Sequence, residues 1–304
     1  MQTQNNTTHQ TLWQLNDIVP MSDDDYALWV TLLEERTGIT LHNLRKSFLL
    51  SKLSIRMHEL GINEYKSYFA YVTHGKHGRV EWETLIDRLT VHETRFFRDT
   101  QSLYFIQQQY LDKLDFKSKK PNINIWSVGC ATGEEPYSLM MFIDKYVSDK
   151  NEKCYLSVTA SDISHDALEI GKKARYPHNR FSNVPAEYIE SYVEDSGDSH
   201  YLVAESLRKR ICFNRLNLLN LNNSSVGKMD IIICQNVLIY FKRKVRIMIL
   251  NQLVNYLLPN GLLIIGAGEI LDWNNSEIKS VPYNGVLAFQ KQETDGTQKL
   301  RYDA

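Results

Sequence analysis

The chain has 304 residues, 43% of them apolar, and a formal net charge of −1 at pH 7. This length can bury a large core and predicts about two domains, while the near-neutral charge argues against broad nucleic-acid binding. The N-terminus lacks the pattern of a targeting segment, and the four widely spaced cysteines predict small buried side chains, with no metal site or disulfide framework. We therefore expect a cytoplasmic protein with no membrane insertion.

Residues 1–20 are rich in Gln, Asn and Thr and are predicted to form a disordered tail. The next region, 21–92, has the 3.6-residue periodicity of helices and predicts an all-α N-terminal domain. Helices are expected at 22–37, 41–60, 63–73 and 80–89, with Ser22 as the first N-cap and Gly61 ending the second helix. A linker helix region, 93–120, follows.

The second expected helix carries a basic stripe. Arg45, Lys52 and Arg56 fall within about 40° of one another at 100° per residue, on a segment whose single acid is Glu59. In most proteins such a stripe is a solvated helix face. It is also a candidate contact for an acidic partner, because a basic ridge steers association.

From 121 to 290 the pattern alternates between strand and helix. Strands are expected at 122–128, 155–161, 229–234 and 261–266, and helices at 135–147, 165–173 and 242–257. This alternation predicts an α/β fold with a parallel sheet. The run 229–234 shows no alternation between polar and apolar residues, which places that strand at the sheet centre. A polar tail is expected from 291 to 304.

The alternation breaks between about 176 and 216. His200–Ala204 and Arg210–Asn214 are strand-like and flank Glu205–Lys209, which is expected to be a turn. We interpret the region as a small antiparallel β-subdomain, although an ordinary loop with a hairpin and no role fits the pattern equally well.

The strongest functional signal lies in Ile125–Met140. An expected strand runs into a turn bounded by Gly129 and Gly133, and a helix follows, which is the shape of a nucleotide-binding first turn. However, Glu134 and Glu135 stand where a dinucleotide site presents bare N–H groups to a pyrophosphate. Carboxylates there suit a ligand with cationic groups, and S-adenosylmethionine is the common adenosine ligand of that kind.

Two further positions fit an adenosine-binding sheet. Asp162 closes the second expected strand, where a carboxylate can accept hydrogen bonds from both ribose hydroxyls, although acids at strand ends are also common helix N-caps. Asn217 and Leu218 follow a strand-like run, where an amide and the backbone could read the adenine edge. Alone, this second signal is weak.

Two other motifs complete the pattern formed by Gly129–Ser138 (GCATGEEPYS). They are Val91–Arg98 (VHETRFFR) and Cys234–Phe241 (CQNVLIYF). Together the three motifs resemble those of the CheR-type chemotaxis methyltransferases, which methylate glutamate side chains of bacterial chemoreceptors. The resemblance covers most of residues 22 to 290. It implies a Rossmann-like class I methyltransferase sheet with a small antiparallel β-subdomain insertion, preceded by an all-α domain.

The resemblance also implies S-adenosyl-L-methionine as the cofactor, with S-adenosyl-L-homocysteine as its product. Arg98 and Tyr240 are implied as the catalytic pair, Glu134 as the group that holds the methionine ammonium, and Asp162 as the ribose ligand. The residues implied to bind the cofactor are His92, Thr94, Arg98, Gly129, Glu134, Asp162, Asn217, Leu218, Asn236 and Val237. The chain differs from the usual family pattern at His92, Gln235 and Ala267.

The implied partners are cytoplasmic helices of methyl-accepting chemoreceptors, with the stripe of Arg45, Lys52 and Arg56 as a candidate contact. A receptor C-terminal tail is a candidate partner for the β-subdomain. Nucleic acid is not expected as a substrate, since the chain has neither an N/D-P-P-Y loop nor a nucleophilic Pro-Cys pair. A cofactor-binding regulatory or scaffold module of the same fold is the alternative function.

Overall fold

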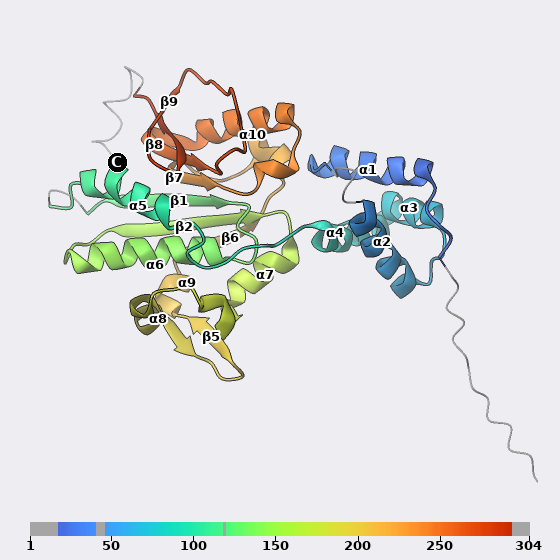
Figure 1. Cartoon of the computed structure of the whole chain (residues 1–304), viewed down its shortest axis with the longest axis horizontal. Helices are drawn as coiled ribbons and strands as arrows, with labels where there is room; N and C mark the ends of the chain where they lie inside the picture. The colour runs from blue at the N-terminus through green and yellow to red at the C-terminus, as the bar shows by residue number, and fades with distance from the viewer. Residues whose placement is uncertain (1–17, 41–45, 118–119, 294–304) are drawn as a thin grey trace, which may run out of the picture.

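The computed structural model describes residues 18–40, 46–117 and 120–293 (Figure 1). Most of the two expected tails therefore lies outside the described residues. Lys291, which the sequence pattern assigned to the C-terminal tail, instead ends a β-strand of the main sheet.

Among the described residues, the helices of the N-terminal domain are α1 (Asp23–Thr37), α2 (Lys46–Leu60), α3 (Tyr65–Thr73) and α4 (Gly75–Leu89). The hydroxyl of Ser22 accepts a hydrogen bond from the Asp25 N–H at 3.1 Å, which confirms the expected N-cap. Helix α4 begins at Gly75, whereas the sequence pattern predicted a start at Val80. The predicted start was late because two glycines weaken the helical pattern of the first turn. One of them, Gly78, packs so closely on α3 that a Cβ would lie 2.7 Å from the Val72 carbonyl oxygen.

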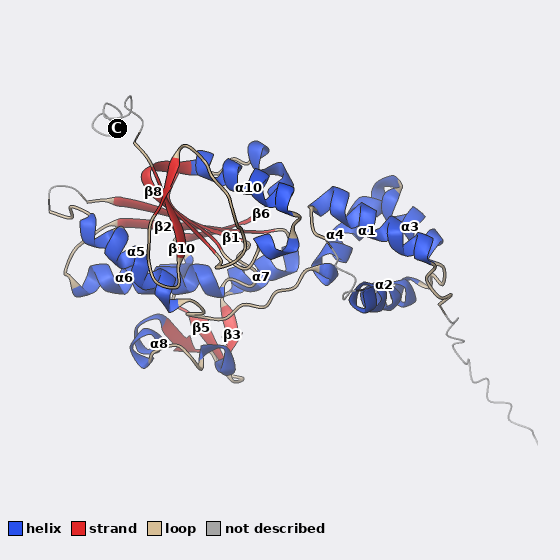
Figure 2. Ribbon diagram, turned by 45° about the horizontal axis from the view of Figure 1, so that its top comes forward, coloured by secondary structure: helices blue, strands red, loops and turns tan. Residues whose placement is uncertain are grey.

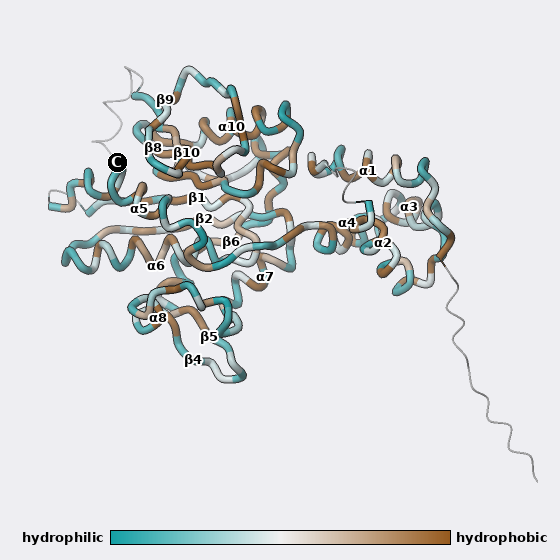
Figure 3. The backbone as a smooth tube through the Cα atoms, in the orientation of Figure 1, coloured by the Kyte–Doolittle hydropathy of each residue, from teal (hydrophilic) through white to brown (hydrophobic). Residues whose placement is uncertain are grey.

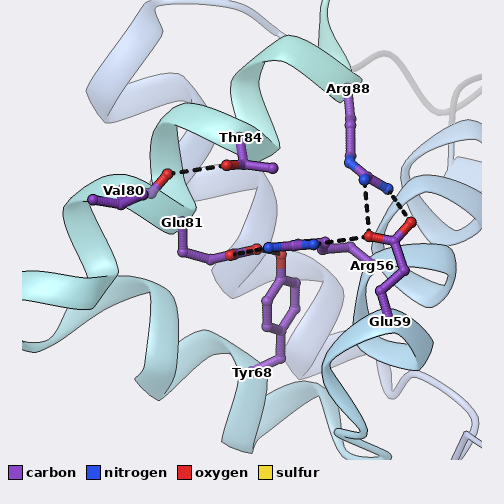
Figure 4. A network of polar contacts seen from close by, with 7 residues as sticks. All are labelled: Arg56, Glu59, Tyr68, Val80, Glu81, Thr84 and Arg88. Atoms are coloured by element: carbon purple, nitrogen blue, oxygen red, sulfur yellow. Dashed lines mark hydrogen bonds and ion pairs between the residues drawn. The ribbon is translucent and has the colours of Figure 1, made fainter.

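Arg56 belongs to a polar network inside this domain (Figure 4). Its guanidinium donates two hydrogen bonds to Glu81, at 2.8 and 2.7 Å, and one to Glu59 at 2.8 Å. The Tyr68 hydroxyl donates to the same Glu81 carboxylate at 2.7 Å, and Glu81 is only 4% exposed. Arg56 therefore pairs with acids of its own domain, and its expected role as a partner contact stays a prediction. Helical periodicity identifies a face of a helix but not the residues that pack against it.

The other two cations of the stripe have different outcomes. Arg45 lies outside the described residues. Lys52 is half-buried, and its amine lies 5.5 Å from the ring centroid of Phe48. Within the part of the chain that the structure describes, Lys52 is thus the member of the stripe that remains available as a partner contact.

We expect Arg56→Ala to lower the free energy of unfolding by about 3 kcal/mol, because it leaves the Glu81 carboxylate buried without its cation. Burial alone raises the pKa of Glu81, but hydrogen bonds from Arg56 and Tyr68 bring it below its ordinary value. This stabilisation is therefore present at neutral pH and is lost on acidification through the lowered pKa. Urea unfolding at pH 7 measures the effect, with Lys52→Ala on the same helix as the control. A loss below about 1 kcal/mol would contradict it.

The second domain is built on a seven-stranded sheet with the order β6-β2-β1-β7-β8-β10-β9. Its strands are β1 (Asn122–Val128), β2 (Tyr155–Asp162), β6 (Ile211–Arg215), β7 (Met229–Cys234), β8 (Leu257–Ile265), β9 (Ile278–Ser280) and β10 (Leu287–Lys291). The strands from β6 to β8 are parallel, and β10 pairs antiparallel with β8 and β9. All of β7 is buried, which confirms its central position and the α/β fold.

Helices cover both faces of this sheet (Figure 2). On one face lie α5 (Thr100–Gln109), α6 (Glu134–Asp149) and α7 (His165–Lys173), and on the other lies α10 (Arg243–Tyr256). Hydrophobic residues follow the strands, while the outer turns are hydrophilic (Figure 3). No helix among the described residues is long and apolar enough to cross a membrane. The cysteine expectation holds for Cys130 and Cys234, which are buried, but not for Cys212, which is exposed.

A separate antiparallel sheet confirms the β-subdomain. It has the order β3-β5-β4, from β3 (Arg175–Pro177), β5 (His200–Val203) and β4 (Val193–Asp195). The expected turn at Glu205–Lys209 is wrong, because the helix α9 (Glu205–Arg208) lies there and β6 joins the main sheet parallel to β2. Strand β5 instead pairs antiparallel with β3 and with β4, and a short turn joins β4 to β5.

Candidate functional site

A pocket of about 310 Å³ lies where β1, β2 and β7 end, between the sheet and the helical domain. This carboxyl edge of a parallel sheet is where α/β proteins bind ligands, and the volume suits a small molecule. Most of the residues named from the sequence line the pocket, namely His92, Thr94, Arg98, Gly129, Asp162, Asn217, Leu218, Asn236, Val237 and Tyr240. Glu134 does not.

The turn after β1 is tied to the end of β2. The backbone N–H groups of Gly129 and Cys130 donate to the Ser161 carbonyl at 2.7 and 3.0 Å. Gly129 has φ +71°, and a Cβ there would lie 2.3 Å from Cγ2 of Val237. Only glycine therefore fits between this turn and the loop after β7.

Asp162 is held in place by the backbone. Its two carboxylate oxygens accept hydrogen bonds from the N–H of Ala131 at 2.9 Å and of Ser164 at 3.0 Å. The N-cap of α7 is Ser164, whose hydroxyl accepts from the N–H of Ala167 at 3.2 Å, so Asp162 is not that cap. Each carboxylate oxygen has further acceptor capacity toward the pocket, as a ribose diol requires.

The two glutamates at the start of α6 point in different directions. Glu134 is fully buried, accepts a hydrogen bond from the Thr132 hydroxyl at 2.6 Å, and lies 3.4 Å from a guanidinium nitrogen of Arg180. Glu135 is half-buried, lines the pocket, and accepts from the Ser127 hydroxyl at 2.6 Å. Consecutive residues of a helix lie about 100° apart, so only one of the pair can face a ligand. The geometry favours Glu135 for the role that the sequence pattern assigned to Glu134.

The acidic residues Glu135 and Asp162 line the pocket together with the cations Arg95 and Arg98. Burial raises the pKa of Glu135 to about 7, and it also raises the pKa of Glu134 and of Asp162. Of these three groups only Glu135 and Asp162 line the pocket, and their ionised forms are stabilised by a cationic ligand and repel an anionic one. This set of residues fits a sulfonium cofactor with an ammonium group and disfavours a pyrophosphate.

The loop after β7 is held by a buried acid that the sequence analysis did not single out. Glu269 is 2% exposed, and its carboxylate accepts from the backbone N–H of Gly266 at 2.8 Å and of Ile239 at 3.4 Å. Arg246 donates to the carbonyl of Glu269 at 2.6 Å and to that of Phe241 at 2.7 Å. The available sequence signal was an acid placed shortly after the apolar run Leu262–Ile265.

The linker between the domains carries Arg98 to the pocket. One guanidinium nitrogen of Arg98 donates to the Glu93 carbonyl at 2.7 Å, and the side chain is exposed. The next residue, Asp99, caps α5 and accepts from the Gln235 amide at 2.8 Å. Gln235 thus joins the linker to the loop that carries Tyr240, and both predicted catalytic side chains line one pocket.

The β-subdomain also contacts the linker. Arg180 donates to the Thr94 carbonyl at 2.9 Å, and Phe181 stacks on Phe96 with ring centroids 4.3 Å apart. The Tyr176 hydroxyl donates to the Thr132 carbonyl in the turn after β1 at 2.7 Å. The subdomain therefore contacts both the linker and the turn after β1, two segments with residues that line the pocket.

Asn217 makes a different contact from the one expected. Its amide nitrogen donates to the Arg36 carbonyl at the end of α1 at 2.6 Å, and its amide oxygen accepts from the Leu219 N–H at 3.0 Å. The side chain thus bridges the two domains. Asn217 and Leu218 still line the pocket, so the backbone there is the better candidate for reading an adenine edge.

Comparison with known proteins identifies both halves of the chain. Residues 92–286 match the family described as CheR methyltransferase, SAM binding domain, and residues 24–90 match CheR methyltransferase, all-alpha domain. Three relatives are each called chemotaxis protein methyltransferase. That of Borreliella burgdorferi is 29% identical, over 88% of this chain and 95% of its own length. Protein 1 of Pseudomonas aeruginosa is 31% identical over 82% of this chain and 90% of its own length. The protein of Vibrio parahaemolyticus is 30% identical over 90% of this chain and 98% of its own length.

Proposed function

The chain belongs to the CheR methyltransferase family, and from this premise we propose that it transfers the methyl group of S-adenosylmethionine to glutamate side chains of chemoreceptors. The product is a glutamate methyl ester. The observation that carries the proposal is that Arg98 and Tyr240 line the same pocket as Asp162 and Glu135. A pair suited to hold a carboxylate thus shares one pocket with a pair suited to hold a cationic adenosine cofactor.

Asp162 is the proposed ligand of the ribose hydroxyls, and Glu135 that of the methionine ammonium. The backbone at Asn217 and Leu218 borders the adenine. When bound, S-adenosylmethionine supplies an electrophilic methyl group whose transfer to a carboxylate oxygen leaves a neutral thioether. A glutamate carboxylate is already ionised at neutral pH, so the protein needs no general base for this reaction.

The catalytic task of the protein is therefore to position the substrate. Arg98 can orient a carboxylate through two parallel N–H groups, and the Tyr240 hydroxyl can donate to the second oxygen. Orientation of this kind contributes several kcal/mol of barrier reduction. A very strong grip on the ground-state carboxylate would reduce its nucleophilicity, so Arg98 serves to aim the carboxylate.

The proposed partners are glutamate-bearing receptor helices. Lys52 is the described residue of α2 that is proposed to contact them, with Arg45 as a further candidate. A receptor C-terminal tail is proposed for the β-subdomain, whose contacts with Thr94 and Phe96 place it beside the pocket.

We expect Glu135→Gln to weaken S-adenosylhomocysteine binding about 10- to 100-fold, the range for losing a hydrogen bond between charged groups. Glu134→Gln, the matched control on the same helical turn, should change the affinity less than about threefold. Because the pKa of Glu135 is raised to about 7 in the free protein, affinity should rise roughly eightfold from pH 6 to pH 7.5 as the carboxyl ionises. Isothermal calorimetry measures both effects. A larger loss for Glu134→Gln, or a pH effect that persists in Glu135→Gln, would contradict this assignment.

The function is tested by incubating the protein with tritiated S-adenosylmethionine and receptor-containing membranes. Carboxyl methyl esters release labelled methanol in base, whereas methylated amines and bases do not. Base-labile label on the membranes supports the proposal, and base-stable label overturns it. Tight cofactor binding without any label would instead favour the alternative of a regulatory or scaffold module.

A further inference from the structure

The end of α1 contacts the loop that carries Tyr240. The carbonyl oxygen of Tyr240 accepts two hydrogen bonds from Thr40, one from its N–H at 2.8 Å and one from its hydroxyl at 3.1 Å. Next to this contact, Ile39 and Phe241 form an isolated antiparallel bridge. A carbonyl held by two donors on one residue has little freedom to rotate, so the peptide that carries Tyr240 is fixed by the helical domain.

The same end of α1 also contacts the loop on the adenine side of the pocket. The Arg36 carbonyl accepts from the Asn217 amide. Between the two contacts lies Gly38, the C-cap of α1, with φ +75°. A Cβ on Gly38 would lie 2.9 Å from Cδ2 of Leu219 and 3.0 Å from Cδ1 of Phe241. Both pocket loops therefore pack against this one glycine.

These contacts are not required merely to dock the two domains, because α4 makes a second set. The Ser164 hydroxyl donates to Asp87 at 2.8 Å, and Arg215 pairs with Glu83 at 3.3 Å. Figure 1 shows the helical domain beside the edge of the sheet where α7 and α10 begin. A change at the end of α1 alone should therefore leave the domains associated.

We infer that residues 36–40, here called the interdomain turn, are a positioning element of the active site, with Thr40 and Gly38 as its positioning residues. Thr40 sets the orientation of the peptide that carries Tyr240. Gly38 sets the spacing between the adenine-side loop and the Tyr240 loop. The inference rests on the proposed function, in which Tyr240 orients the substrate carboxylate. It makes the helical domain a structural part of the active site.

The first test compares Thr40→Val, which keeps the N–H and the shape but removes the hydroxyl, with Thr40→Ser, which keeps the hydroxyl. We expect Thr40→Val to lower kcat about tenfold, with S-adenosylhomocysteine affinity and receptor KM within about twofold of the parent, because small displacements of an orienting group act on the chemical step. Thr40→Ser should keep kcat within about twofold. An unchanged kcat in Thr40→Val, or an equal loss in both variants, overturns the role of Thr40.

The second test compares Gly38→Ala with Gly61→Ala. Gly61 has φ +69°, and a Cβ added there would have no atom within 4 Å, so both changes carry a similar backbone penalty, but only Gly38→Ala pushes on the pocket loops. We expect Gly38→Ala to weaken S-adenosylhomocysteine binding about tenfold and Gly61→Ala to leave it unchanged, with a loss of melting temperature in both variants that is larger for Gly38→Ala. Equal affinities in the two variants overturn the inference. Because the binding assay does not require methyl transfer, it tests the interdomain turn even if the parent protein methylates no receptor. Absence of methylation would count only against the proposed function.

Discussion

Arg98→Ala is expected to lower kcat/KM for receptor methylation by roughly 100- to 1,000-fold, the range for removing a preorganised charged donor from a reacting group. Arg98 is the last residue of the linker motif, and it lines the pocket together with Tyr240. Without it, a glutamate carboxylate loses the group that orients it toward the methyl donor. Steady-state methylation measures the loss, and calorimetry with S-adenosylhomocysteine should show a much smaller change.

Three further variants make this result specific. Arg98→Lys should restore only part of the rate, because an ammonium cannot donate two parallel hydrogen bonds. Tyr240→Phe should lower kcat and leave cofactor affinity nearly unchanged. Arg95→Ala removes an exposed charge that also borders the pocket, and it should have a small effect that decreases with salt. A loss in Arg95→Ala equal to that in Arg98→Ala would indicate a general positive field, and near-parental turnover in Tyr240→Phe would remove that residue from the mechanism.

Gly129→Ala is expected to weaken S-adenosylhomocysteine binding about 100-fold and to lower the melting temperature by several degrees. The new Cβ would lie 2.3 Å from Cγ2 of Val237, and φ +71° adds a backbone penalty of about 1 kcal/mol. Since this turn and the Val237 loop both line the pocket, their separation should disrupt the site directly.

The double variant Gly129→Ala/Val237→Ala identifies the cause. If the clash with Val237 dominates, the second change should recover at least half of the lost binding free energy, whereas Val237→Ala alone should have a minor effect. Equal affinities for the single Gly129→Ala and the double variant would show that backbone strain, and not the contact with Val237, is responsible. Parental affinity in Gly129→Ala would exclude a close approach at this turn.

The sequence by itself determined the elements whose signals are local. Strand β1 occupies the expected residues 122–128, β7 the expected 229–234 and α7 the expected 165–173. Burial on both faces gives continuous apolar runs, and alternation of strand and helix gives a parallel sheet, so composition and order are sufficient. The glycine turn and Asp162 were also placed correctly at the pocket, because the ends of parallel strands necessarily lie at one edge.

Only the tertiary structure determined which strands pair with each other and which side chains line the pocket. Strand β6 pairs with β2 and not with β5, because both strand-like runs have the same local pattern and only the packed sheet distinguishes the partners. The choice between Glu134 and Glu135 depends on the rotation of α6 about its axis, which adjacent identical side chains do not reveal.

The same reason explains the remaining differences. Arg56 donates hydrogen bonds to Glu81, which lies 25 residues further along the chain. Asn217 donates to the Arg36 carbonyl, which lies 181 residues earlier. Periodicity reports only the face of an element, and motifs report only residue type. Contacts between distant segments arise when two domains pack, and they determine whether a polar side chain is available to a ligand or is used to hold the fold together.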